Sequence, residues 1–292
     1  EYIALYAEMP SMADMSHFAR TGSSAFDIYV KCGAKYVYHD TFMPTLGDHY
    51  EAISRFKVPG MKDVMLHFPT YSDVKNLYIG VAEGSRIEHS APYRYSKPVV
   101  YYGSSITQGA CASRPGNAYE AIISNDLDCD FINLGFSGSA LAEEAITDYI
   151  NSLDMSVFVM DYDHNAPNPE HLERTHEAFF KKIRASHPDL PVIMISRPTF
   201  EEGYGGPHAY GISVIPPENE MLRCREVVFR TYMNAVNAGD RSVYFIDGAS
   251  LFNGPHADLC TVDGVHPNDA GFLRMADRIG SFVSAALPED PA

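Results

Sequence analysis

The 292-residue sequence has no tryptophan, only five cysteines and no long run of apolar residues. No apolar run approaches the roughly 20 residues that a membrane-spanning helix needs. The cysteines are widely spaced and odd in number, and none forms a Cys-x-x-Cys pair, which argues against a disulfide-rich scaffold and against a zinc site of that type. We expect most of them to be ordinary buried thiols. They are Cys32, Cys111, Cys129, Cys224 and Cys260.

Basic residues are also scarce, since 22 Lys and Arg stand against 38 Asp and Glu, for a formal net charge of −16. A chain of this sign repels phosphate backbones and anionic lipid headgroups. We therefore expect no nucleic-acid partner and no membrane partner. A neutral small molecule or an oligosaccharide is the expected substrate, and the sequence does not indicate an oligomeric state.

The cellular location is not fixed by the sequence. Cysteines without a pairing pattern favour the cytoplasm over an oxidising compartment. The chain begins at Glu1 and not at Met, so a leader could have been trimmed, and export stays open.

The first third of the chain has a different pattern of apolar and polar residues from the rest. Residues 1–95 contain short β-type segments, several of which alternate apolar and polar residues, separated by turn-forming residues. This pattern predicts an antiparallel β-sandwich of the jelly-roll-like kind. A linker is expected over residues 84–97. The expected strands are 2–9, 25–33, 34–42, 50–58, 63–70 and 74–81.

The remainder, residues 96–292, alternates strand and helix patterns. Near-continuous apolar strands separated by amphipathic helices indicate a five-stranded parallel sheet that is covered on both faces, a three-layer α/β/α domain. Ligands of such sheets bind beyond the carboxyl ends of the strands. The expected strands are 98–103, 129–135, 155–163, 191–198 and 242–248, and the expected helices are 116–126, 139–152, 169–187, 219–238 and 268–286.

Hydroxyl, glycine, amide, acid and imidazole groups follow these strands. Such a set contains what acyl transfer needs: a nucleophile, a base, an orienting acid and oxyanion donors. The residues after the first four strands are Ser104 and Ser105, then Gly135 to Gly138, then Asp161, Asp163, His164 and Asn165, then Arg197. The segment "TVDGVHPNDAGF" follows the fifth strand and leads into the last helix.

Four short blocks occur in this part of the chain: Gly103-Ser104-Ser105-Ile106-Thr107; Asn133, Gly135, Ser137 and Gly138; Asn165; and Asp263-Gly264-Val265-His266-Pro267. Together they resemble the motifs of the SGNH (GDSL-type) hydrolases. All four occur in the family's order over residues 98–287. The β-rich leader and "GSSITQG" also resemble a branch with an N-terminal sandwich domain, many of whose members act on acetylated carbohydrate. The resemblance implies a flavodoxin-like fold for the catalytic domain.

The resemblance places the nucleophile on Ser105, not Ser104, with Asp263 and His266 completing a triad. It implies an oxyanion hole formed by the backbone N–H groups of Ser105 and Gly138 and the side-chain amide of Asn165. Two positions depart from the family pattern. Ser104 replaces the usual acid, and the third block, which contains Asn165, reads "DYDHNAPN" instead of the common Gly-x-Asn-Asp.

The triad also makes chemical sense without the family. A serine hydroxyl is a poor nucleophile and needs a base within hydrogen-bond reach. Pro267 restricts the backbone next to His266. Asp263, three residues earlier, can accept the second ring N–H and set the tautomer. We expect no cofactor and no metal in the reaction.

Simpler interpretations compete at several positions. The two serines could merely begin a helix, and Asp263 with His266 could be a helix cap beside a surface histidine. Asp247 is a rival acid. Asp161, Asp163 and His164 suggest a metal, but carboxylates at i and i+2 of an extended segment face opposite ways.

The long Gly- and Pro-rich segment 200–220 is a candidate lid or binding wall. Tyr204, His208 and Tyr210 are candidate contacts to a sugar ring, since the chain has 19 tyrosines but no tryptophan. Cys111 lies near the nucleophile and is expected to belong to the core.

The sequence thus predicts a two-domain serine esterase that acts on small-acyl esters, above all O-acetylated carbohydrate. Two alternatives stay open. One is a lipid or thioester acyl hydrolase, which would need a deep apolar acyl groove. The other is a carbohydrate-binding protein whose catalytic set has decayed, against which the intact Ser, His and Asp argue.

Overall fold

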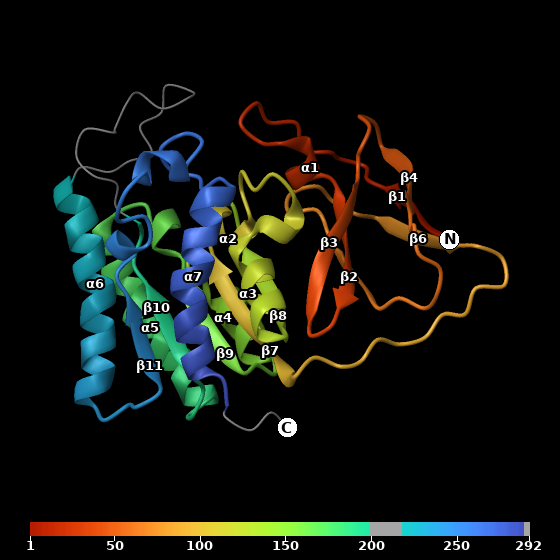
Figure 1. Ribbon diagram of the computed structural model, residues 1–292. Helices are drawn as coiled ribbons and strands as arrows, with labels where there is room; N and C mark the ends of the chain where they lie inside the picture. Colours follow the sequence, from red (N-terminus) through yellow and green to blue (C-terminus); the bar gives the residue numbers. More distant parts are fainter. Residues whose placement is uncertain (199–217, 289–292) are drawn as a thin grey trace.

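The computed structural model describes residues 1–198 and 218–288. An N-terminal β-sandwich packs beside an α/β domain (Figure 1). Tyr204, His208 and Tyr210 lie outside the described residues. No helix in the described ranges is long and apolar enough to cross a lipid bilayer.

Two antiparallel three-stranded sheets form the sandwich, in the orders β4-β1-β6 and β3-β2-β5. Alternate residues of β1 and β2 point inward, so Leu5 and Ala7 of one sheet share a core with Phe26 and Ile28 of the other. The predicted β-sandwich is therefore confirmed. Its strands are β1 (Tyr2–Glu8), β2 (Phe26–Cys32), β3 (Lys35–Phe42), β4 (His49–Arg55), β5 (Val64–His67) and β6 (Asn76–Val81).

The second domain has a five-stranded parallel sheet in the order β11-β10-β9-β7-β8. This is the flavodoxin-like order, in which the first strand lies between the second and the third. The predicted fold class is confirmed. The linker expected over residues 84–97 extends too far at its C-terminal end, because Tyr95 already belongs to a strand of this sheet and pairs with Cys129. The strands are β7 (Tyr95–Gly103), β8 (Cys129–Gly135), β9 (Val157–Asp161), β10 (Val192–Ile195) and β11 (Val243–Ile246).

Helices cover both faces of this sheet (Figure 1). Successive strand residues face opposite sides, so Val99 and Tyr101 pack in one layer while Val100 and Tyr102 pack in the other. Helices α3 and α7 contribute to the first layer, and α4, α5 and α6 to the second. Their bounds are α3 (Tyr119–Leu127), α4 (Glu144–Asn151), α5 (Pro169–Ser186), α6 (Glu218–Asn237) and α7 (Asp269–Ala286).

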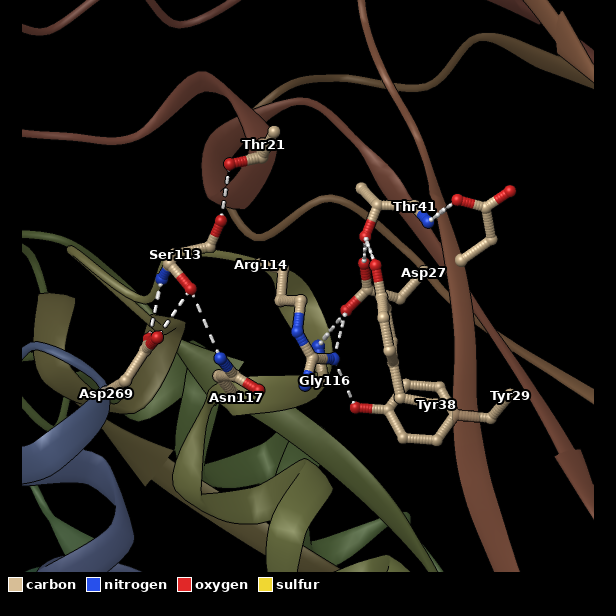
Figure 2. A network of polar contacts seen from close by, with 11 residues as sticks. Thr21, Asp27, Tyr29, Tyr38, Thr41, Ser113, Arg114, Gly116, Asn117 and Asp269 are labelled. Carbon is tan, nitrogen blue, oxygen red and sulfur yellow. Dashed lines mark hydrogen bonds and ion pairs between the residues drawn. The ribbon is translucent and has the colours of Figure 1, made fainter. Parts of the chain in front are cut away.

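A buried carboxylate of the sandwich holds a loop of the α/β domain (Figure 2). Asp27 of β2 is fully buried and accepts hydrogen bonds from Arg114 Nη1 at 3.1 Å and from the Gly116 backbone N–H at 2.9 Å. Arg114 Nη1 also donates to Tyr29 Oη at 2.5 Å, and its guanidinium lies 4.1 Å from the Tyr38 ring centroid. The sandwich therefore fixes the chain that follows the predicted nucleophile.

The same loop is bound on its other side to the start of α7 (Figure 2). Asp269 accepts hydrogen bonds from the Ser113 backbone N–H at 2.8 Å and from Ser113 Oγ at 2.5 Å. Thr21 of the sandwich donates to the Ser113 carbonyl at 2.5 Å. Because Asp269 is three residues beyond His266, these bonds link the sandwich, the loop after Ser105 and the segment of His266.

Candidate active site

The two serines at the end of β7 have different partners. Ser104 is the N-cap of the short helix α2 (Ser105–Gln108), and its Oγ accepts a hydrogen bond from the Ile106 N–H at 3.1 Å. Ser105 is the first residue of that helix, and its hydroxyl contacts an imidazole. The helix folds back closely on the strand, as the space at Gly103 shows: a Cβ added there would lie only 2.0 Å from Thr107 Oγ1. Glycine at 103 therefore permits the turn that presents Ser105.

Ser105, His266 and Asp263 form a continuous hydrogen-bonded chain. Ser105 Oγ lies 2.9 Å from His266 Nε2, and His266 Nδ1 lies 2.7 Å from Asp263 Oδ2. The ionised Asp263 accepts the Nδ1 proton, so Nε2 is the acceptor for the serine hydroxyl. The serine is largely buried and keeps 9% of its surface exposed. This is the geometry that nucleophilic acyl transfer requires.

The loop that carries the acid and the base is rigidly tied. The other oxygen of Asp263, Oδ1, accepts the backbone N–H groups of Val265 at 3.0 Å and His266 at 2.8 Å. A β-bridge between Thr261 and Pro267 closes the base of the loop. Burial disfavours the Asp263 charge, but the hydrogen bonds from His266 and Val265 outweigh it and hold the pKa of Asp263 well below its usual range. The acid is therefore ionised at neutral pH.

The predicted oxyanion donors lie on three segments that are bonded to one another: Ser105 at the start of α2, Gly138 in the turn after β8 and Asn165 after β9. Phe136 N–H donates to the Gly103 carbonyl at 2.8 Å, which brings the end of β8 to the nucleophile turn. Gly138 has φ +68°, is exposed, and would have no atom within 4 Å of an added Cβ. Asn165 Oδ1 accepts the Ala140 N–H at 3.0 Å. This bond assigns Oδ1 as the acceptor end of the amide, so Nδ2 is its donor.

The sandwich contributes aromatic side chains beside the triad, which the sequence interpretation missed. The His17 and Phe18 rings lie 5.8 Å and 6.3 Å from the His266 ring, measured between centroids. Tyr71 packs edge-on against Phe18, and its hydroxyl lies 3.5 Å from the Ser105 carbonyl oxygen. These residues occur in no motif of the sequence. Only the docking of the two domains brings them to the site.

Cys111 lies in the same place and is not activated. It is buried with φ +67°, and burial together with the nearby Asp263 charge raises the pKa of its thiol to about 12. The thiol is therefore protonated at neutral pH and is a poor nucleophile. Burial and the neighbouring His266 lower the pKa of His17. One ligand atom each of His17, Cys111 and His266 lie within 4.8 Å of one another.

The rival acid Asp247 and the other two acids that follow the strands, Asp161 and Asp163, all have other partners. Asp247 makes two hydrogen bonds with Arg225, at 2.9 and 2.5 Å, and caps the short helix that follows β11. Asp163 binds the Arg197 side chain, with 2.8 Å between Nε and Oδ1. Asp161 points elsewhere and accepts hydrogen bonds from Thr107 Oγ1 and Tyr119 Oη, both at 3.2 Å. These acids hold loops and the core in place.

The fold and the site define the chain as a serine hydrolase of the esterase type. The model of the GDSL-like lipase/acylhydrolase family matches residues 96–284, and the chain belongs to that family. A second model, for the N-terminus of SGNH-hydrolase-type esterases, matches residues 1–87. A search of curated proteins gave no match.

Solved structures agree with this assignment. A protein of Bacteroides ovatus ATCC 8483 described as a GDSL-like lipase is 28% identical, with a TM-score of 0.85 over 98% of this chain and 81% of that one. The salicylyl-acyltransferase SsfX3 from a tetracycline biosynthetic pathway is 17% identical, with a TM-score of 0.67 over 97% and 81%. A family two carbohydrate esterase of Clostridium thermocellum, in complex with cellohexaose, is 13% identical, with a TM-score of 0.67 over 97% of this chain and 89% of that one. The last two likenesses concern the fold.

Proposed function

We propose that the protein removes acetyl groups, or other small acyl groups, from carbohydrate hydroxyls through an acyl-enzyme on Ser105. The observation that carries the proposal is the hydrogen-bonded chain from Ser105 Oγ through His266 to Asp263, at 2.9 and 2.7 Å. The reaction consumes an ester and water and yields an alcohol and a carboxylic acid.

In the first half of the reaction, Ser105 Oγ attacks the ester carbonyl carbon and its proton passes to His266 Nε2. Asp263 stabilises the imidazolium that forms and holds the ring in place. When the tetrahedral intermediate collapses, the bond to the alcohol oxygen breaks and His266 gives its proton to that oxygen. The alcohol leaves, and the acyl group stays on Ser105.

In the second half, water attacks the acyl carbon and His266 takes its proton. The serine then leaves with a proton returned by His266, and the acid is released. In both halves the carbonyl oxygen becomes negative. The backbone N–H groups of Ser105 and Gly138 and the Asn165 amide are the proposed donors, and the loss of one such donor costs about 10²–10³-fold in kcat.

The small-acyl preference is supported by the residues at the nucleophile. The β8 turn is built from Gly135, Ser137 and Gly138, with Phe136 as its one bulky residue. On the other side Tyr71 and Phe18 stand against the triad segment. A carbohydrate alcohol suits the net charge of −16, and the Clostridium thermocellum neighbour is a carbohydrate esterase in complex with cellohexaose.

The test is acetate release from a panel of acetylated oligosaccharides, together with hydrolysis of 4-nitrophenyl acetate. Ser105→Ala, matched with Ser104→Ala, is the control for contaminating esterases. We expect acetate release that requires Ser105. If the wild type hydrolyses the nitrophenyl ester but none of the acetylated sugars, the carbohydrate part of the proposal is wrong and the esterase part stands.

A further inference from the structure

Two histidines and a cysteine from three separate segments meet at the candidate active site. One ligand atom each of His17, Cys111 and His266 lie within 4.8 Å of one another. His17 comes from the sandwich, Cys111 from the loop after α2, and His266 from the loop before α7. Residues far apart in the sequence therefore converge on one point.

These ligand types select a particular class of ion. Imidazole nitrogen and thiolate sulfur bind Zn²⁺ and other borderline or soft cations, whereas Mg²⁺ and Ca²⁺ prefer oxygen. A tetrahedral zinc site with Zn–N of about 2.0–2.1 Å and Zn–S of about 2.3 Å separates its ligand atoms by roughly 3.3–3.7 Å. The three ligand atoms, none more than 4.8 Å from another, are near enough for small side-chain movements to close on one ion.

The surroundings of His266 also suit a metal ligand. A histidine that binds a metal through one nitrogen usually donates its other ring N–H to a carboxylate. The Nδ1 of His266 already bonds Asp263 at 2.7 Å, which leaves Nε2 as the nitrogen for the metal. The loop that carries Cys111 is fixed two residues further on, where the Ser113 backbone N–H donates to Asp269 and Thr21 of the sandwich donates to the Ser113 carbonyl.

We propose that His17, Cys111 and His266 Nε2 form a site for Zn²⁺ or a similar cation, and that the bound ion inhibits the esterase. Binding displaces one proton, from the Cys111 thiol to solvent, and forms a metal–sulfur bond and two metal–nitrogen bonds. Water takes the fourth position. The ion occupies the lone pair of Nε2 that would accept the Ser105 proton, so the base is lost for as long as the ion stays bound.

The experiment uses the full chain after dialysis against a chelator. Calorimetric titration with Zn²⁺ should show one strong site, and Cd²⁺ should produce the ultraviolet charge-transfer band of a cadmium–thiolate bond. Hydrolysis of 4-nitrophenyl acetate should fall more than tenfold at a saturating Zn²⁺ concentration and recover when the chelator is added. Mg²⁺ and Ca²⁺ at the same concentration should have no effect.

Variants separate this site from adventitious binding. Cys111→Ser should keep the metal-free activity, lose the cadmium band and require at least tenfold more Zn²⁺ for inhibition. Cys32→Ser, which removes an exposed cysteine of the sandwich, should behave as the wild type. Should Cys111→Ser fail to fold, His17→Gln measured by calorimetry takes its place, with at least a tenfold weaker affinity expected.

The variant Ser105→Ala tests zinc binding separately from the proposed esterase function. This variant should bind Zn²⁺ about as tightly as the wild type even though it hydrolyses nothing. The proposal is overturned if the wild type has no strong zinc site, or if Cys111→Ser is inhibited as easily as the wild type and the control Cys32→Ser. A protein that binds the ion but hydrolyses no ester would retain the site and contradict only the proposed function.

Discussion

Arg114 of the catalytic domain donates a hydrogen bond of 3.1 Å to Asp27, a fully buried carboxylate of the sandwich. The pair joins the two domains next to the loop that follows Ser105. Burial by itself disfavours the Asp27 charge and raises its pKa, and the Gly116 N–H, Thr41 and Arg114 oppose that shift. The buried Asp27 carboxylate therefore needs these donors to offset the loss of its hydration, and the donors need the carboxylate as their hydrogen-bond acceptor.

Asp27→Ala should lower the free energy of unfolding by about 3–5 kcal/mol, because it leaves the half-buried Arg114 charge and the Gly116 N–H without their acceptor. Urea denaturation measures the change. The matched control is Asp14→Ala, since Asp14 forms an exposed pair with Arg20 at 3.7 Å, and such pairs contribute less than about 1 kcal/mol. Equal losses in the two variants would show that the domain contact does not depend on Asp27.

Ser105→Ala should abolish ester hydrolysis and change the melting temperature little, because its hydroxyl serves the chemistry. Ser104→Ala should show the opposite pattern. Its Oγ caps α2 at 3.1 Å from the Ile106 N–H, so we expect a loss of about 1 kcal/mol with most activity kept. Nitrophenyl acetate kinetics and thermal melts of both proteins distinguish them. An inactive Ser104→Ala beside an active Ser105→Ala would move the nucleophile by one residue.

Asp263→Asn should lower kcat by roughly 10⁴-fold with little loss of structure. The asparagine oxygen can still accept the Val265 and His266 N–H groups, but its amide N–H₂ then faces Nδ1. That contact favours the tautomer with the proton on Nε2, which cannot accept the Ser105 proton. Asp247→Asn is the control, because Asp247 binds Arg225 at 2.5 Å and not His266. Loss of activity only in Asp247→Asn would reassign the acid.

The order and type of nearly all elements could be predicted from the sequence, because each strand and helix carries its own hydrophobic period. The three residues of the candidate triad could be named from the sequence as well, since Asp263 and His266 lie in one short motif and Ser105 closely follows the end of a strand. His17 and Tyr71 could not. They reach the site only because the sandwich docks on the loop around Arg114. No local pattern records that docking, in which Arg114 bonds Asp27 from 87 positions away in the sequence.

Asp161 should make stability fall as the pH rises. Burial raises its pKa to about 7 from the ordinary 3.8, against the hydrogen bonds from Thr107 and Tyr119. Between about pH 4 and pH 7 the folded protein therefore holds a proton that the unfolded chain has lost, so its contribution to stability, full below about pH 4, is lost as the pH rises through about 7. Asp161→Asn cannot ionise, and its amide oxygen can accept the same two hydroxyl groups.

The measurement is the melting temperature at pH 5 and at pH 8. The melting temperature of Asp161→Asn minus that of the wild type should be more positive at pH 8 than at pH 5. Some dependence on pH should persist, because burial also raises the pKa of the neighbouring Glu120. The exposed substitution Asp14→Asn should follow the wild type at both values. A difference between pH 5 and pH 8 that Asp161→Asn leaves unchanged would contradict an ionisable Asp161 in the folded core.

The acyl-chain preference separates the proposed acetylesterase from a lipid or thioester hydrolase. Each methylene that an enzyme buries gains about 0.8 kcal/mol, so a groove for long chains raises kcat/KM as the chain grows. Around Ser105 the β8 turn offers Gly135, Ser137 and Gly138, and only Phe136 supplies a large apolar surface there, at 38% exposure. On the opposite side Tyr71 lies against the Ser105 backbone.

We therefore expect kcat/KM to be highest for the acetyl member of a nitrophenyl ester series and to fall steeply by butyryl. The same series run with Tyr71→Ala should lose part of this preference if the tyrosine limits the acyl space. A wild-type rate that stays level or rises towards octanoyl would favour the lipid hydrolase instead.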